Sequence, residues 1–360
     1  MLIYGVRQGD AAMAKLPPQK YNSWSQYFLN ILPGFLLALV GAVFVWSLVS
    51  VTPPSWPVNY VLYSIVLGMV LRNVVKLPVI FKEGLGFSAK ILLFMGVIFL
   101  GGTIDISVII ATGPHAIILA IIAVTSMITL SYVLGRFIGL PEDSKALLGI
   151  GMGVCGVSAI VALTPVIKAK ERYILTAIVA SLLNSVILLF TIPILVHWIS
   201  MPELLAGYWS GAISSNTAQA IATGFAIGEE AGTIATITKT ARNALMAFAI
   251  LYFAYSYTRK GLPIGVKLRP LLIWEKFPKF IFGLIIMSLL STFGLFTAEV
   301  MAQFKDLSRW FFMICFVGMG YEISFRDFKL NDFKPVLFGL FLSLILAVVA
   351  YLYINLFIHV

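Results

Sequence analysis

Small and polar residues interrupt two long apolar stretches of this chain. The first reads LGIGMGVCGVSAIVALTPVIKAKE from residue 148 to residue 171, and its centre holds Gly153, Cys155, Gly156 and Ser158. Glycine lets the backbone leave the helical path, so amides and carbonyls become free to meet an ion. Close helix packing through small residues is the alternative interpretation. The pattern therefore indicates either a broken helix with an ion site or a tight helix contact.

The second stretch reads GYWSGAISSNTAQAIATGFAIGEE from residue 207 to residue 230. Five neutral hydrogen-bonding side chains lie in six positions at its centre: Ser214, Ser215, Asn216, Thr217 and Gln219. Such side chains are costly in lipid unless they find partners. Hydrogen bonding between helices would satisfy them, but their clustering favours a pocket for a ligand or an ion.

Two basic residues follow within another apolar run. Lys239 and Arg242 are three positions apart, so a helix places them on one face. Charges inside a membrane are costly and mark a transport pathway or a counter-charge. The alternatives are extension of both side chains to the membrane surface, or ion pairs with Glu229 and Glu230. A basic face beside a broken helix favours an anionic substrate.

The elements that must position these residues are membrane-spanning helices. Apolar residues make up 60% of the chain and charged residues 11%, with a mean hydropathy of +1.00, values typical of a polytopic membrane protein. A spanning helix needs about 20 apolar residues. We place apolar runs at 27–51, 57–72, 88–107, 114–136, 144–167, 172–199, 204–228, 231–258, 279–298, 305–321 and 334–358. The sequence thus predicts an all-α polytopic protein.

The net charge of +10 is concentrated in a few short loops, which indicates orientation and not nucleic-acid binding. The basic residues are Arg7, Lys15 and Lys20, then Arg72, Lys76, Lys82 and Lys90, then Arg259, Lys260, Lys267, Arg269, Lys276 and Lys279. By the positive-inside rule, residues 1–26 form a cytoplasmic lead-in. One transmembrane domain follows over 27–358, and the C-terminus is external.

A further basic cluster decides between two topologies. If every run crosses the membrane, Lys168, Lys170 and Arg172 fall outside, against the positive-inside rule. If 144–167 and 204–228 enter and leave on the same side, the cluster returns to the cytoplasm. We therefore expect nine full spans plus two broken or re-entrant elements that dip from opposite faces. Eleven spans with two broken crossing helices is the alternative.

An internal echo indicates two related halves, about 27–199 and 204–358. Phe94 to Ser107 reads FMGVIFLGGTIDIS, and Phe311 to Ser324 reads FFMICFVGMGYEIS. The predicted topology runs the two copies in opposite directions, as in transporters with inverted repeats; chance similarity of apolar windows is the alternative. We expect the acids in these copies, Asp105 and Glu322, to cap helix turns.

Other chemistry has little support in the sequence. Cys155 and Cys315 are single and far apart, and the histidines have no metal-ligand spacing. No phosphate-binding loop, nucleophile elbow or zinc-protease motif is present. We therefore expect no enzyme activity, no cofactor and no resident metal.

The two polar segments resemble the signatures of a bacterial membrane family labelled as sulfate exporters, the YeiH-like or UPF0324 proteins. Leu148 to Glu171 is similar to the first signature, and Gly211 to Gly224, followed by Lys239 and Arg242, is similar to the second. That family is similar to the superfamily of cation/proton antiporters and bile-acid symporters. The resemblance implies a panel and a core domain, paired broken helices, alternating access by a moving core in the plasma membrane, and a homodimer.

One departure concerns the coupling ion. Where many relatives carry a His-Glu pair in the second signature, this chain has Ser215 and Asn216. Neither side chain titrates near neutral pH, which puts proton coupling through that pair in doubt. Neutral oxygen ligands suit Na⁺ instead, so H⁺ and Na⁺ both stay open.

We expect a secondary transporter that moves a small anion, such as sulfate, another sulfur oxyanion or an organic anion. The alternative is a cation/proton antiporter. The expected anion site lies between the two broken segments, where backbone amides and polar side chains replace the water shell of the ion. Its predicted residues are Gly153, Cys155, Gly156, Ser158, Ser214, Ser215, Asn216, Gln219, Lys239 and Arg242.

Overall fold

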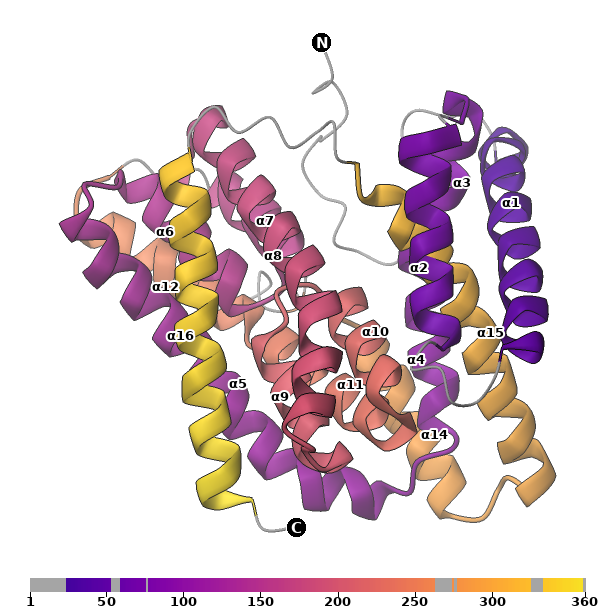
Figure 1. The fold of residues 1–360 in the computed structure, drawn as a ribbon. Coiled ribbons are helices and arrows are strands. Elements are labelled where there is room, and N and C mark those ends of the chain that lie inside the picture. The colour runs from indigo at the N-terminus through magenta and orange to yellow at the C-terminus, as the bar shows by residue number, and fades with distance from the viewer. Residues whose placement is uncertain are drawn as a thin grey trace.

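The computed structural model describes residues 24–52, 59–75, 77–262, 274, 277–324 and 333–358. Within these ranges the secondary structure is helical and contains no strand (Figure 1). Five of the described helices are long and apolar enough to cross a membrane: Ser25–Val51, Val79–Gly101, Ile106–Phe137, Glu171–Trp198 and Phe333–Phe357. The prediction of an all-α polytopic membrane protein is confirmed. Most of the predicted lead-in, together with Lys76, Lys267, Arg269 and Lys276, lies outside the described residues.

The helices form two bundles. One buried apolar cluster lies within a single bundle, and the other extends across the contact between the two bundles. The panel bundle, on the right in Figure 1, is built from the first helices of the chain and from two later helices that precede the last one. Close contacts of glycines hold it together, since a Cβ on Gly68 would lie 2.2 Å from the carbonyl oxygen of Val317. The panel bundle comprises α1 (Trp24–Val51), α2 (Tyr60–Val70) with η1 (Leu71–Val75), η2 (Val79–Phe81), α3 (Lys82–Phe87), η3 (Ser88–Leu92), α4 (Leu93–Gly101), α14 (Phe280–Thr292) and α15 (Ala298–Glu322).

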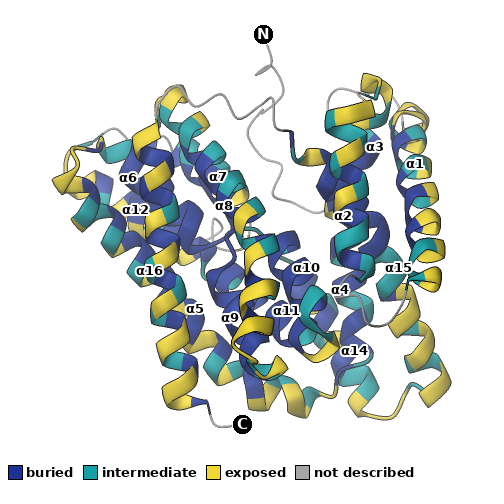
Figure 2. Ribbon diagram, viewed as in Figure 1, coloured by how far each residue is buried: buried dark blue, intermediate teal, exposed yellow. Residues whose placement is uncertain are grey.

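The core bundle, on the left in Figure 1, comes from the middle of the chain together with the last helix. Its helices are buried toward one another and exposed on the outer faces, where large apolar side chains suit lipid (Figure 2). The core bundle comprises α5 (Ile106–Phe137), α6 (Glu142–Gly153), α7 (Val157–Ile167), α8 (Glu171–Trp198), α9 (Glu203–Ile213), α10 (Thr217–Ile227), α11 (Glu229–Ala244), α12 (Met246–Arg259) and α16 (Phe333–Phe357).

Both polar segments are broken helices that fold back as hairpins. The amide of Lys170, just after α7, donates to Asp143 Oδ2 at the start of α6 (3.2 Å). The amide of Glu230, just after α10, donates to Glu203 Oε2 at the start of α9 (3.1 Å). The 28-residue α8 lies between the two hairpins and separates their bases by about 40 Å. The hairpins therefore fold back from opposite ends of α8, and the prediction of two broken, folded-back segments is confirmed. The membrane face that each hairpin enters stays a prediction.

The base of the first hairpin carries a charged network. Lys145 and Lys260 both bind Glu142, the second at 2.9 Å. Burial alone would raise the pKa of Glu142, but the hydrogen bonds from the two lysines outweigh it and lower that pKa below its usual value. This network ties α12 to α6.

The echoed segments lie side by side in the panel bundle. A Cβ on Gly96 would lie 2.6 Å from the Phe312 ring, and one on Gly318 would lie 2.5 Å from the Leu85 carbonyl oxygen. The partner number falls as the residue number rises, so the segments are antiparallel, as an inverted repeat requires.

The two acids of the echo differ in role. Asp105 caps α5 by accepting from the Ser107 amide (2.7 Å), which confirms the predicted cap. Hydrogen bonds from the Ser107 hydroxyl and amide lower the pKa of Asp105. Glu322 is the last residue of α15, where an acid cannot cap the free amides of a helix start, so that part of the prediction is wrong.

Candidate functional site

The tips of the two hairpins meet beside the middle of α8. Gly156 at the first tip lies against Ser215 at the second, since a Cβ on Gly156 would be 3.1 Å from the Ser215 carbonyl oxygen. The Ser215 hydroxyl in turn bonds with Asn184 Nδ2 (3.0 Å) and with the Ser185 hydroxyl (3.1 Å) on α8. The structure thus brings together residues that are about 60 positions apart in the chain.

Lys239 of α11 connects the two hairpin tips through its side chain. Its side chain is fully buried. Nζ donates to the carbonyl oxygens of Val154 (2.6 Å) and Ser214 (2.7 Å), and more weakly to that of Ser215 (3.3 Å). Each tip therefore contributes carbonyls to one ammonium group.

Arg242 repeats this arrangement one turn further along α11, and it too is fully buried. On the first hairpin its Nε donates to the Gly153 carbonyl (3.0 Å) and its Nη2 to that of Met152 (2.7 Å). On the second hairpin Nη1 donates to the carbonyls of Ala212 and Ser214. The planar guanidinium can bond to both hairpins because its donors are fixed in a fork.

These bonds show which helix ends the side chains of Lys239 and Arg242 occupy. The carbonyls belong to the last turns of α6 and α9, which carry the negative ends of the helix dipoles and lack partners within the helix. Lys239 and Arg242 therefore act as C-terminal caps inside the bundle. Extension to the membrane surface is excluded, because neither side chain reaches the surface. Ion pairing with Glu229 is excluded as well, because Glu229 pairs with Lys305 and Arg309 instead.

The opposite helix ends are the starts of α7 and α10, which present backbone amides. α7 begins at Gly156, which has φ +62° and provides no side-chain cap. Ser158 in the first turn of α7 is exposed. α10 begins at Asn216, whose side chain accepts from the Ala218 amide (2.9 Å), while Gln219 accepts from the Asn216 amide (3.4 Å). The start of α7 thus has no side-chain cap, whereas α10 is capped by its own side chains.

The charge balance of this region is positive. With both side chains protonated, Lys239 and Arg242 contribute two charges, the ends of α6 and α9 about −0.5 each, and the starts of α7 and α10 about +0.5 each. None of the buried residues that the structure describes is an Asp or a Glu. The tips therefore hold about two positive charges with no buried carboxylate to balance them, an arrangement that attracts an anion.

All ten predicted site residues lie at or beside the hairpin tips. Gln219 Nε2 donates to the Ser214 hydroxyl (3.0 Å), and the Cys155 thiol contacts Met246 Sδ at 3.6 Å. Within the described ranges no group of three or more His, Cys, Asp or Glu side chains is placed to hold a metal. Sequence reasoning missed the polar residues that α8 and α11 add to the tips, namely Ser181, Asn184, Ser185 and Asn243.

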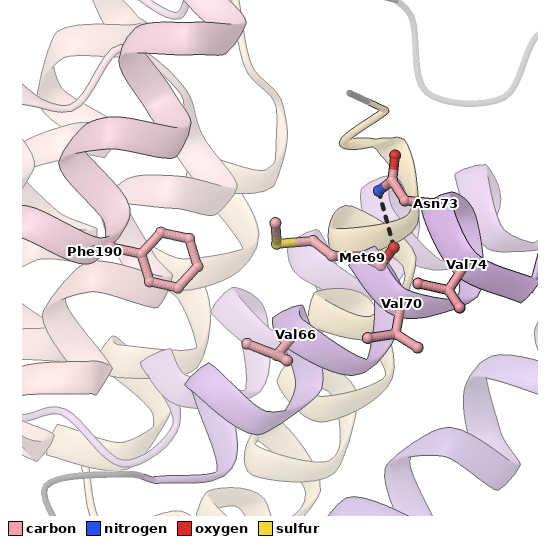
Figure 3. Close-up of a pocket in the computed structure, with 6 residues that line it drawn as sticks. All are labelled: Val66, Met69, Val70, Asn73, Val74 and Phe190. Carbon is pink, nitrogen blue, oxygen red and sulfur yellow. Dashed lines mark hydrogen bonds between the residues drawn. The ribbon is translucent and has the colours of Figure 1, made fainter. Parts of the chain in front are cut away.

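The core bundle meets the panel bundle through few polar contacts. Glu229 Oε1, at the start of α11, binds Arg309 Nη2 of α15 (2.9 Å), and the Asn59 side chain of α2 donates to the Phe225 carbonyl of α10 (2.9 Å). Further along the interface lies an apolar pocket (Figure 3). Phe190 of α8 faces α2 across this pocket, which is lined by Val66, Met69, Val70, Asn73, Val74 and Phe190.

Comparison with known proteins gives the same picture across the chain. A family model described as conserved hypothetical protein 698 matches residues 33–339. A UPF0324 membrane protein of Clostridium tetani is 26% identical over 91% of this chain and 96% of its own length. The UPF0324 membrane protein YdhF of Lactococcus lactis is 28% identical over 92% of this chain and 100% of its own length. Because the match includes both hairpins and most of both bundles, the chain belongs to this family of UPF0324 membrane proteins, as its two polar segments predict.

Proposed function

We propose that this protein is a secondary transporter that moves a small anion across the plasma membrane by alternating access. One observation carries the proposal: two fully buried cations lie where two half-helices end, and no buried acid among the described residues balances them. Isolated buried charge is costly, and a bound anion would neutralise it. Sulfate, other sulfur oxyanions and small organic anions all fit this requirement.

The anion would bind at the amide end of α7, beside the hairpin tips. Helix N-termini bind anions through free amides and the positive end of the dipole. Ser158 lies in this first turn and is exposed, so its hydroxyl can reach a ligand that enters from solvent. Lys239 and Arg242 would act from the second layer, since their donors already bind carbonyls and their charge lowers the cost of anion entry.

Movement of the core bundle along the panel bundle would expose the tips to each side in turn. The apolar contacts that α8 and α10 make with the panel bundle are non-directional, and the apolar surface of α2 at the pocket offers few hydrogen bonds to break during sliding. The Glu229 ion pairs with Arg309 and Lys305 would break in such an elevator-like step. In the orientation that the basic loops predict, the base of the first hairpin faces the cytoplasm.

Cation/proton antiport is the alternative, and two observations weigh against it. The carbonyl ends of broken helices coordinate cations in other transporters, but here Lys239 and Arg242 already occupy them. The centres of both hairpins also hold no acid that could bind Na⁺ or exchange a proton.

Anion counterflow in proteoliposomes tests the proposal, with two variants at Ser158. Ser158→Asp places a negative charge at the start of α7, which suits the helix dipole but repels an anion by about 2 kcal/mol or more at short range. Ser158→Asn is the matched neutral control. We expect Ser158→Asp to be stable yet to lose counterflow about tenfold or more, while Ser158→Asn stays active.

The outcomes separate the site from the function. If Ser158→Asp exchanges anions as well as the unmodified protein does, the site at α7 is wrong. If the unmodified protein exchanges no phosphate, sulfate, sulfite, organosulfonate or dicarboxylate, anion transport itself is wrong, and Na⁺-driven or K⁺-driven proton movement in the same vesicles becomes the test of antiport.

A further inference from the structure

Two buried polar atoms at the hairpin tips have no hydrogen-bond partner among the described residues. They are the Ser181 hydroxyl of α8 and the Asn243 Oδ1 of α11. Ser181 is 1% exposed and Asn243 is 5% exposed, so bulk water does not satisfy either side chain. A buried polar atom without a partner is costly, so each one calls for an explanation, such as a bound ion or water or a functional role.

Each of these atoms lies at the start of one half-helix. A Cβ on Gly156, the N-cap of α7, would lie 2.5 Å from Ser181 Oγ, so this hydroxyl contacts the tip of the first hairpin. Asn243 Nδ2 donates to the hydroxyl of Thr217, the first residue of α10, at 3.0 Å. Its Oδ1, on the same amide, is therefore also beside a helix start. The starts of α7 and α10 thus share one feature: a neighbouring helix places a polar atom without a hydrogen-bond partner beside each of them.

The two atoms differ in hydrogen-bonding capacity, and this difference determines which ligand fits. A serine hydroxyl can donate to an anion, whereas an amide oxygen can only accept. With Nδ2 already bonded to Thr217, Asn243 Oδ1 needs a donor from the ligand. A sulfate dianion has no hydrogen to donate, whereas hydrogen phosphate and hydrogensulfite each keep one acidic hydrogen.

We propose that Ser181 and Asn243 complete the anion site and that Asn243 selects oxyanions that keep an O–H group. This inference rests on the proposed anion transport and narrows its substrate class. Ser181 donates to an anion oxygen at the start of α7, and the O–H group of the same ion donates to Asn243. A site built to bond such a group rejects the analogue that lacks it, because its own polar atom is then left buried and unpaired.

Inorganic phosphate and sulfate test this inference in calorimetric titrations of the full chain in detergent. At a pH where phosphate is mostly HPO₄²⁻, the two tetrahedral ions have the same charge and differ in one hydrogen. We expect phosphate to bind about tenfold tighter or more. Asn243→Leu should bring the ratio of the two affinities close to one, and Ser181→Ala should weaken both ions alike. Ser144→Ala is the matched control, because Ser144 is also buried and unpartnered but lies at the base of the first hairpin.

The ratio of phosphate affinity to sulfate affinity is measured first on the unmodified protein, because this measurement does not depend on the folding of a variant. Equal binding of the two ions, tighter binding of sulfate, or no binding of either overturns the inference; so does a ratio that Asn243→Leu leaves unchanged. These results leave anion transport standing if counterflow of another anion is observed. The expected ratio without any counterflow keeps the site and removes transport.

Discussion

Replacing Arg242 by methionine should destabilise the fold itself, because the guanidinium caps two half-helices at once. The substitution keeps the apolar stem but leaves the carbonyls of Met152, Gly153 and Ala212 without their buried donor. The carbonyl of Ser214 keeps a partner, since Lys239 also binds it. At about 1 kcal/mol for each orphaned carbonyl, the low end of the usual range, the loss is about 3 kcal/mol or more. That is a large share of the ~5–15 kcal/mol that stabilises a typical protein.

Thermal unfolding in detergent measures this loss, and a drop in Tm of about 5 °C or more is expected. The Tm of Arg242→Lys should fall between that of the unmodified protein and that of Arg242→Met, since an ammonium group keeps the charge but cannot reproduce the planar fork. Arg309→Met is the control, because this arginine pairs with Glu229 at an exposed site, where ion pairs contribute about 0–1 kcal/mol. A Tm of Arg242→Met equal to that of Arg309→Met would refute the capping role and return Arg242 to direct anion binding.

Three further predictions concern the tips and the base of the hairpins. Gly156→Ala should lower stability and anion binding, since a Cβ there would clash with Ser181 Oγ; Gly139→Ala, at a positive φ with open space around it, measures the backbone strain alone. Asn216→Ala should cost about 1 kcal/mol in thermal unfolding through the lost cap, whereas Asn216→Asp should keep the cap and lose anion affinity in titrations. Folding lowers the pKa of Glu142, so its ion pairs stabilise the fold above 4.5, the ordinary value, and this stability is lost as the pH falls through the lower folded pKa; Glu142→Gln should flatten the Tm profile in that acid range.

The topology could be predicted because charge and polarity act over short stretches of chain. Lys168, Lys170 and Arg172 could return to the cytoplasmic side only if the segment before them folded back, and the structure joins Lys170 to Asp143 accordingly. The joint between α11 and α12 at Leu245 could not be predicted in this way. It has no glycine or proline, so tertiary packing and not local sequence places it.

The partners of the site residues were beyond the reach of the sequence. The spacing of Lys239 and Arg242 predicted a shared basic face, but their carbonyl partners lie 85 and 89 positions earlier, at Val154 and Gly153. A backbone carbonyl leaves no mark on residue type, so no motif could reveal the bond. Ser181, Asn184 and Ser185 share one face of the 28-residue α8, but such polar residues in an apolar helix resemble ordinary helix contacts.

The direction of each half-helix explains why this site suits an anion. A broken helix exposes carbonyls at the end of its first half and amides at the start of its second half. In both hairpins the protein fills the carbonyl ends with its own cations, Lys239 and Arg242, and in the first hairpin this leaves the uncapped start of α7 for a ligand. The neutral residues Ser215 and Asn216 also favour an anion, because they add no negative charge where a His-Glu pair would place a glutamate. The local balance therefore stays near two positive charges, and an oxyanion with two negative charges neutralises it more fully than a monoanion does.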